Sequence, residues 1–273
     1  MSPKVLYAMS SWSGSRAIVN FDDSYLEKHI EQLKKIKHNL TQISIGNPEN
    51  PSKREEFEEY IQSLKEVSGV PVVVHNVPNI GRSYGQWARI YDKYRTDFDY
   101  YIFVEDDYQP VLDNFDNVLI DMYEKMECGF LCGVIFDEEG RYAMPPITKH
   151  AGVTNGIASS KVLEKVRERF LCLPHDTGKE YHWGQILFSR GFVEAGFSLA
   201  EYIESKEYRC LYFQQDETIR IYGNNKKGTD IFNPKQVVGN EDKFEYIHYS
   251  EFDRPITQPI RKSRSNLVGR NRR

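Results

Sequence analysis

The sequence predicts an α/β protein with a mostly parallel central sheet between layers of helices. Strand-like and helix-like segments alternate over the first 107 residues, as in sheets whose parallel strands are joined by helices. Residues 70–75 and 100–104 are short apolar runs, which is typical of strands covered on both faces. The second run leads directly into Glu105, Asp106 and Asp107. Together these features predict a layered fold with polar groups at the ends of its strands.

The first half of the chain carries a clear order of elements. We predict strands at residues 5–9, 42–45, 70–75 and 100–104. A helix over about 23–37 shows apolar residues near helical spacing, and Ser52 and Glu55 form a capping box for a second helix. A third helix is expected at about 83–94. Each predicted helix therefore separates two predicted strands.

The second half is less regular. We expect a helix after Pro110 that ends at Gly129, a strand at 130–136, a loop at 137–158 and a helix at 160–170. A further helix is expected at 182–195, and short strands at 209–213 and 218–222. Beyond about residue 223 the pattern is polar and rich in turn residues. Residues 261–273 carry six Arg or Lys, so we expect a solvated, disordered tail.

Composition excludes several classes of protein. A chain of 273 residues with a net charge of −4 does not favour a broad nucleic-acid surface. No apolar run approaches the roughly 18 residues of a membrane span, and the start of the chain resembles no signal peptide. The four cysteines lack paired CxxC spacing, so zinc is not expected and the thiols are interpreted as reduced. We therefore expect a cytoplasmic protein.

Glu105, Asp106 and Asp107 form the most informative motif. Adjacent carboxylates repel one another unless water or a cation compensates their charge. In an open α/β sheet, the carboxyl ends of the strands border the ligand crevice. Ligands made only of oxygen suit Mg²⁺ or Mn²⁺. The alternative interpretation is a solvated acidic turn without a function.

A second motif follows the strand at 70–75 and opens a helix. Gly81 and Gly85 permit close approach of the backbone, and Arg82 can pair with a phosphate. A helix N-terminus also offers free N–H groups to an anion. Alone, this segment could equally be a glycine-containing turn with a surface arginine.

The ordered set of motifs resembles the GT-A family of glycosyltransferases. That family has a strand, an Asn-x-Gly segment with a helix, and a strand that ends in an acidic DxD motif. Here Asn79-Ile80-Gly81 and Glu105-Asp106-Asp107 take those places. The resemblance implies a Rossmann-like α/β/α domain over residues 1–260. Residues 1–130 would bind a nucleotide-diphosphate sugar, and 131–260 a glycan acceptor.

The resemblance also implies roles for the acidic residues. A Mn²⁺ or Mg²⁺ ion would be bound by Asp107, with Glu105 near the donor ribose and Asp106 in support. His248 would be a second metal ligand, as late histidines are in some members of this family. An isolated histidine in a short apolar stretch can equally be structural.

Donor and acceptor residues follow from the same resemblance. Ser10, Ser11 and Asn47 lie where the family holds the nucleotide base, although they are equally explained as turn residues. The acceptor side would include His150, Thr154 and Asn155, and Tyr181 or Trp183 could stack on a sugar.

The catalytic base is the point where this sequence departs from the family. Gly184 and Gln185 stand where an acidic pair is expected in inverting enzymes. Glu180 is the first candidate for the base and Asp176 the second. If neither acts, a retaining mechanism would place Gln185 at the sugar. The departure leaves the stereochemistry open.

We therefore predict a metal-dependent glycosyltransferase of glycan biosynthesis that uses a nucleotide-diphosphate sugar, expected to be a UDP-sugar, and a hydroxyl acceptor. A nucleotidyltransferase of related fold is the main alternative. Such enzymes normally carry a glycine-rich loop after the first strand, whereas this loop has only Gly14 and Arg16. A catalytically inactive sugar- or nucleotide-binding protein remains a third hypothesis. A metal-dependent nuclease is disfavoured by the acidic charge.

Overall fold

The computed structural model describes residues 2–12, 25–50, 55–110, 112–137, 149–171, 188–189, 191–192, 195–201 and 212–214. The first half contains β1 (Val5–Ser10), α1 (Tyr25–Lys35), β2 (Gln42–Pro48), α2 (Glu55–Ser63), β3 (Glu66–Val67), β4 (Val70–Val77), α3 (Arg82–Tyr94) and β5 (Tyr100–Glu105). A short 3-10 helix, Arg95–Asp97, precedes β5. Then follow β6 (Tyr108–Pro110), α4 (Phe115–Met126), β7 (Phe130–Asp137), β8 (Lys149–Ser159), α5 (Ser160–Leu171), β9 (Leu199–Glu201) and β10 (Tyr212–Gln214).

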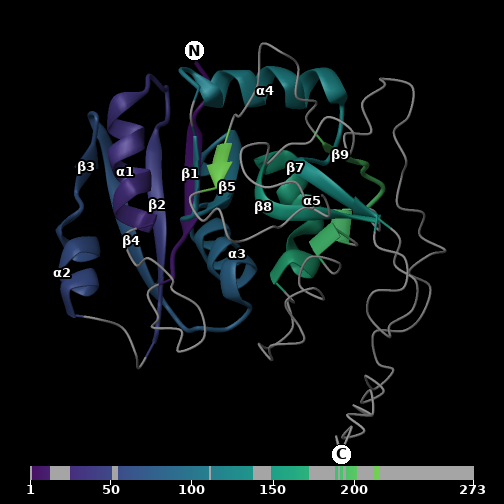
Figure 1. The fold of residues 1–273 in the computed structure, drawn as a ribbon. Coiled ribbons are helices and arrows are strands. Elements are labelled where there is room, and N and C mark those ends of the chain that lie inside the picture. The colour runs from purple at the N-terminus through teal and green to yellow at the C-terminus, as the bar shows by residue number, and fades with distance from the viewer. Residues whose placement is uncertain are drawn as a thin grey trace, which may run out of the picture.

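An eight-stranded sheet forms the centre of the fold, in the order β3-β4-β2-β1-β5-β8-β7-β9 (Figure 1). The strands β4, β2, β1 and β5 are mutually parallel. β8 runs antiparallel to both of its neighbours, β5 and β7, and β9 runs parallel to β7. The predicted α/β class with a mostly parallel sheet is thus confirmed.

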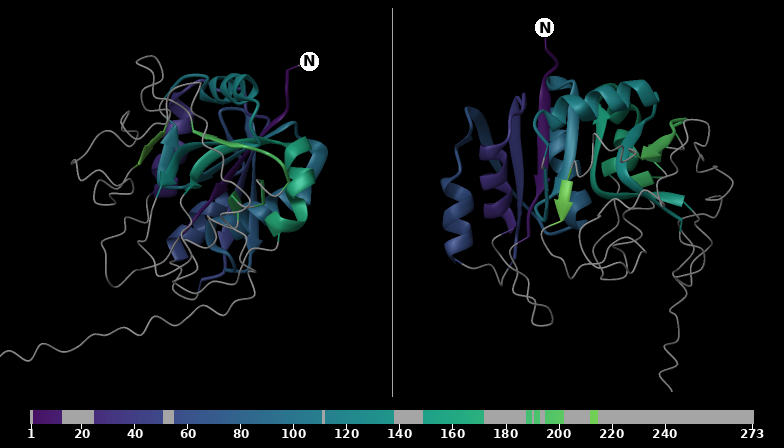
Figure 2. Two further views of the ribbon diagram at one scale, coloured as in Figure 1. Left: turned by 90° about the vertical axis from the view of Figure 1, so that its right-hand side faces the viewer. Right: turned by 45° about the horizontal axis from the view of Figure 1, so that its top comes forward.

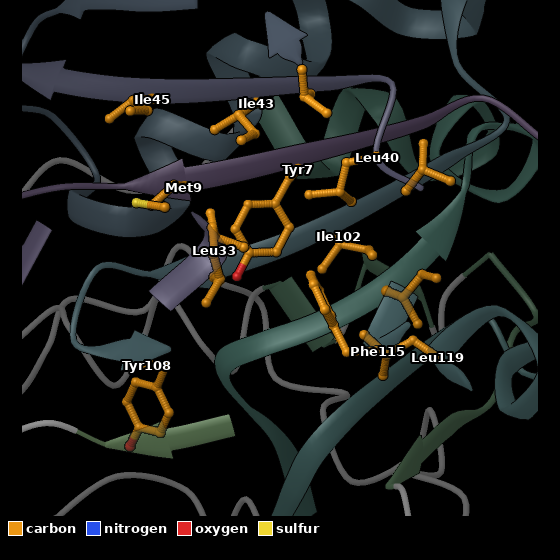
Figure 3. Packing of buried hydrophobic residues seen from close by; sticks show 14 of the residues in the cluster. Tyr7, Met9, Leu33, Leu40, Ile43, Ile45, Ile102, Tyr108, Phe115 and Leu119 are labelled. Carbon is orange, nitrogen blue, oxygen red and sulfur yellow. The ribbon is translucent and has the colours of Figure 1, made fainter. Parts of the chain in front are cut away.

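Helices cover both faces of this sheet (Figures 1 and 2). Side chains of α1, α2 and α4 pack with Tyr7, Ile43 and Ile102 on one face. Figure 3 shows this core from close by, with Leu33 of α1 and Phe115 of α4 among its members. On the other face, α3 and α5 pack with Leu6 and Phe103. The three layers follow from the alternation of side chains along strands that are buried on both faces.

The loop expected over residues 137–158 was wrong for residues 149–158, which belong to β8. Residues 138–148 lie outside the described part of the chain. Its sequence, KHAGVTNGIAS, lacks the apolar run or strict alternation that predicts a strand. Gly156 has a packing reason. A Cβ at Gly156 would overlap the Phe130 ring and the Leu131 carbonyl oxygen. Close packing against β7 therefore selects a residue that sequence patterns associate with loops.

Smaller differences concern boundaries and short strands. β3, β6 and β9 were not predicted, since strands of two or three residues carry almost no periodicity. α4 ends at Met126 rather than Gly129, and Glu127 takes the left-handed conformation after it, with φ 49°. β10, Tyr212–Gln214, overlaps the expected strand at 209–213, of which residues 209–211 lie outside the described part of the chain. Most of the expected helix at 182–195, the strand at 218–222 and the tail lie outside the described residues.

Candidate active site

The candidate site lies at the carboxyl edge of the sheet, where β1 sits between β2 and β5. From β1 the chain moves to β2 and β4, and then crosses to β5 on the other side of β1. In open α/β sheets, a reversal of this kind marks the place between the two strands where a ligand crevice is expected. The register pairs Ser10 with both Gly46 and Glu105. The predicted residues from three separate segments therefore meet at one edge.

The acidic motif forms a tight turn between β5 and β6, and its first two carboxylates have different partners. Ser83 of α3 donates its hydroxyl to Glu105 Oε1 at 2.5 Å. Asp106 is buried, and its Oδ2 accepts the Trp12 backbone N–H at 2.9 Å. Asp107 is only partly buried. Asp106 thus holds the backbone of Trp12, at the start of the loop after β1.

The electrostatics of this turn are unfavourable. Burial, followed by the negative charge of Asp107, raises the pKa of Glu105 well above its usual range, against the Ser83 hydrogen bond. The same two causes raise the pKa of Asp106, although the Trp12 N–H opposes them. A cation beside these groups would reverse this balance. The donor set of the turn therefore fits a hard divalent ion.

The turn is also supported from inside the core by a residue that sequence analysis missed. His29 of α1 is fully buried, and its Nδ1 lies 3.1 Å from the Asp106 carbonyl oxygen. Because a carbonyl only accepts, Nδ1 carries the proton and Nε2 accepts the Tyr7 hydroxyl at 3.0 Å. Burial lowers the pKa of His29 to about 3, so the ring stays neutral. The signal available in the sequence was a histidine on the apolar face of a predicted helix.

The predicted anion segment forms a strained turn at the start of α3. Gly81 and Arg82 both have positive φ, at 79° and 49°. Arg89 donates to the Ile80 carbonyl at 2.9 Å, and a Cβ on Gly85 would overlap that same oxygen. The positive charge of Arg82 lowers the pKa of Glu105. Arg82 therefore lies close enough to the acidic turn to act on its charge, and its predicted pairing with a phosphate stays a prediction.

Ser11 is buried at the end of β1 and is held by α3 and β2. Its N–H donates to Gln86 Oε1 and its carbonyl accepts Gln86 Nε2, both at 3.1 Å. Its hydroxyl donates to the Gly46 carbonyl at 2.6 Å. Ser10 is also buried, with its hydroxyl 3.4 Å from the Val104 carbonyl. Both serine hydroxyls thus bond to the protein backbone, which is the turn interpretation of these residues.

Asn47 lies at the carboxyl end of β2 within a polar network. Its Nδ2 donates to Asn76 Oδ1 at 2.8 Å and lies 3.1 and 3.2 Å from the two carboxylate oxygens of Glu58. Gln62 of α2 also donates to Glu58 and Asn76. The network fixes the Asn47 side chain beside the crevice, and it brings Glu58 and Asn76 to a place where sequence analysis expected only Asn47.

Two later segments approach the same edge. β8 pairs Asn155 with Val104, one residue before Glu105, and Asn155 is buried. His150 pairs with Phe136 further along the edge. β10 pairs Gln214 with Tyr108, directly after the acidic turn. The backbone therefore carries parts of the predicted acceptor half to the crevice.

Several predicted residues lie outside the described part of the chain. They are the base candidates Glu180 and Asp176, Gln185, the metal candidate His248, and the aromatic residues Tyr181 and Trp183. The side chain of Thr154 is likewise outside it. Within the described residues, no three His, Cys, Asp or Glu side chains converge as a metal cluster.

Comparisons with known proteins add little to this description. No family model and no curated protein matches the sequence. Among solved structures, a putative glucose-1-phosphate thymidylyltransferase from Bacillus anthracis, in complex with a sucrose, is similar over 75% of this chain and 87% of that chain. The identity is 13% and the TM-score 0.47. Along the described residues, no helix is long and apolar enough to cross a membrane. Similarity this slight assigns no activity to the chain.

Proposed function

We propose that this protein transfers a sugar from a nucleotide-diphosphate donor, with a UDP-sugar first among the candidates, to a hydroxyl of a glycan acceptor, with Mn²⁺ or Mg²⁺ as cofactor. One observation carries the proposal. Glu105 and Asp107 belong to a carboxylate turn at the crevice between β1 and β5, and burial and mutual repulsion raise the pKa of Glu105. A divalent ion together with a diphosphate would compensate that charge.

Each residue of the turn has a separate task in this proposal. Asp107 would hold the ion, and Glu105, fixed by Ser83, would lie on the ribose side. Arg82 and the N–H groups at the start of α3 would donate hydrogen bonds to the diphosphate. The ion, when bound, would stabilise the negative charge of the departing diphosphate. Glu180 or Asp176 would take the acceptor proton in an inverting reaction, and Gln185 would face the sugar in a retaining one.

Nucleotidyl transfer is the second candidate, because the same turn could serve a nucleoside triphosphate and its metal. It is also the type of activity named for the similar solved structure. The sequence of the loop after β1, with Gly14 and Arg16 but no dense run of glycines, favours glycosyl transfer. The two reactions release different products, so product analysis can distinguish them.

The first test is a calorimetric titration of UDP, GDP and a set of nucleotide sugars, with and without Mn²⁺. We expect one nucleotide to bind in a Mn²⁺-dependent manner to the wild type. Asp107→Ala should abolish that binding while the protein stays folded, whereas Asp121→Ala on the exposed face of α4 should bind as the wild type does. Normal binding and turnover in Asp107→Ala would exclude the assigned metal site.

Product analysis then separates the candidates. Release of a nucleoside diphosphate from a nucleotide sugar, dependent on an added acceptor, supports glycosyl transfer. Release of pyrophosphate from a nucleoside triphosphate and a sugar 1-phosphate would establish the second candidate instead. Metal-dependent binding with neither product would identify a binding protein.

A further inference from the structure

Gln86 contacts Ser11, a residue far from it in the sequence. It lies on the first half of α3 and is only 4% exposed. Its side-chain amide accepts the Ser11 N–H and donates to the Ser11 carbonyl, both at 3.1 Å. A primary amide carries a donor and an acceptor like a peptide group. Gln86 therefore pairs with Ser11 much as a neighbouring strand would.

This pairing replaces the sheet ladder at the end of β1. Ser10 is the last residue of β1 that pairs with β2, opposite Gly46. One residue later, Gln86 occupies the space beside Gly46, where a Cβ would overlap its Oε1 and Cβ atoms. The Ser11 hydroxyl bonds to the Gly46 carbonyl at 2.6 Å. The absence of a side chain at Gly46 thus gives the Gln86 amide access to the chain as it leaves the sheet.

The direction of the chain beyond β1 matters for the acidic turn. Trp12, the next residue, donates its backbone N–H to Asp106 Oδ2 at 2.9 Å. Asp106 in turn donates its N–H to the Ser10 carbonyl at 3.0 Å. A continuous set of hydrogen bonds therefore runs from α3 through Ser11 and Trp12 to the residue before Asp107.

We propose that Gln86 is a positioning residue for donor binding: its amide sets the path of Ser11 and Trp12, and through them the acidic turn. The inference rests on the proposed function, since it assumes that this loop and turn receive a nucleotide with its metal. In this proposal Gln86 contacts neither the nucleotide nor the metal. Its contribution is to present both segments in one geometry before the ligand arrives.

Two substitutions at this position separate the hydrogen bonds from packing. Gln86→Met keeps the length of the side chain and removes both bonds. Gln86→Glu reproduces both bonds when the acid is protonated, because its O–H can donate while its carbonyl accepts. When ionised, it has only acceptors and repels the Ser11 carbonyl. Ser11 and Gly46 carry no titratable side chain. Burial raises the pKa of Glu105 and of Asp106 to about 8, and both groups titrate in the wild type as well. The ratio to the wild type at each pH therefore isolates the response of the added acid.

The readouts are the Kd of the nucleotide in Mn²⁺, relative to the wild type at each pH, and hydrogen exchange at the Ser11 and Trp12 amides. We expect Gln86→Met to bind about tenfold more weakly, within the usual range for residues that orient a site, and to exchange faster at Ser11. For Gln86→Glu we expect a ratio near one at pH 6 that rises by pH 8.5. Gln32→Met on α1 is the matched control and should leave both readouts unchanged.

The outcomes distinguish this inference from the proposed function. Wild-type affinity in Gln86→Met, or a Gln86→Glu ratio that does not change with pH, would overturn the positioning role. Should Gln86→Met fail to fold, Gln86→Glu and Gly46→Ala decide, because Gly46→Ala displaces the amide and should match the methionine variant. A wild type that binds no nucleotide would refute the proposed function. Unchanged Ser11 exchange in the Gln86 variants would then also refute the pairing.

Discussion

Replacing His29 by glutamine should make the protein less stable at neutral pH but less sensitive to acid. The pKa of His29 falls from 6.5 to about 3 because the ring is fully buried. As the pH falls below 6.5, the His29 ring therefore stays neutral in the folded protein, whereas it binds a proton in the unfolded chain. The stability associated with a neutral His29 is present above pH 6.5 and is lost as the pH falls from 6.5 towards 3.

The magnitude follows from this shift. Each pH unit within the window removes about 1.4 kcal/mol of unfolding free energy, so the wild type should lose about 2 kcal/mol through His29 between pH 7.5 and 5.0. At pH 7.5, His29→Gln should be less stable by about 1–3 kcal/mol, since the Tyr7 and Asp106 partners in the core are disturbed.

Denaturant unfolding of both proteins at a series of pH values between 7.5 and 5.0 provides the test. Other titrating groups act equally in the wild type and the variant, so the difference between their unfolding free energies isolates His29. Across the series, the unfolding free energy of His29→Gln relative to the wild type should rise by about 2 kcal/mol. Parallel curves would show that His29 is not a buried neutral base, and the account of the support beneath the acidic turn would fail.

Two further changes test other parts of the structure. Gly85→Ala should lower the melting temperature and weaken nucleotide binding in the proposed assay, because its Cβ would overlap the Ile80 carbonyl; normal melting would contradict the tight turn before α3. Glu164→Gln should cost about 1–2 kcal/mol, since Glu164 of α5 accepts hydrogen bonds from Tyr91 and Arg95. Thermal melting at low and high salt checks this, and we expect a smaller difference in high salt.

The sequence was most informative where a residue's environment repeats along the chain. β4 and β5 contain apolar runs, and α1 and α3 carry regular apolar faces, so local sequence patterns predicted all four. It failed at β8, where the requirement comes from a neighbour. Gly156 is small because Phe130 fills its space, and no local pattern encodes a contact between strands that are far apart in sequence.

The same distinction applies to the candidate site. Glu105, Asp106 and Asp107 are adjacent in sequence, so their unusual charge density was visible without a structure. Gln86 and His29 were not, because each is an ordinary helical residue until the fold brings its partner close. Gln86 meets Ser11 across 75 positions of the chain, and His29 meets Asp106 across 77. Residues that orient a site are in general harder to predict than those that contact a ligand, since their chemistry is complete only in the fold.

The three consecutive carboxylates of the acidic turn are not equivalent. The first two accept hydrogen bonds from different parts of the protein. Glu105 accepts a hydrogen bond from the Ser83 hydroxyl of α3, and Asp106 accepts one from the Trp12 N–H in the loop after β1. A buried carboxylate with a raised pKa is unfavourable by itself, yet an asparagine at position 106 could also accept the Trp12 N–H. In the proposed function, a bound divalent ion would be the positive partner that compensates a charge at this position. A bound cation beside Asp107 would stabilise the charge of Asp106 as well.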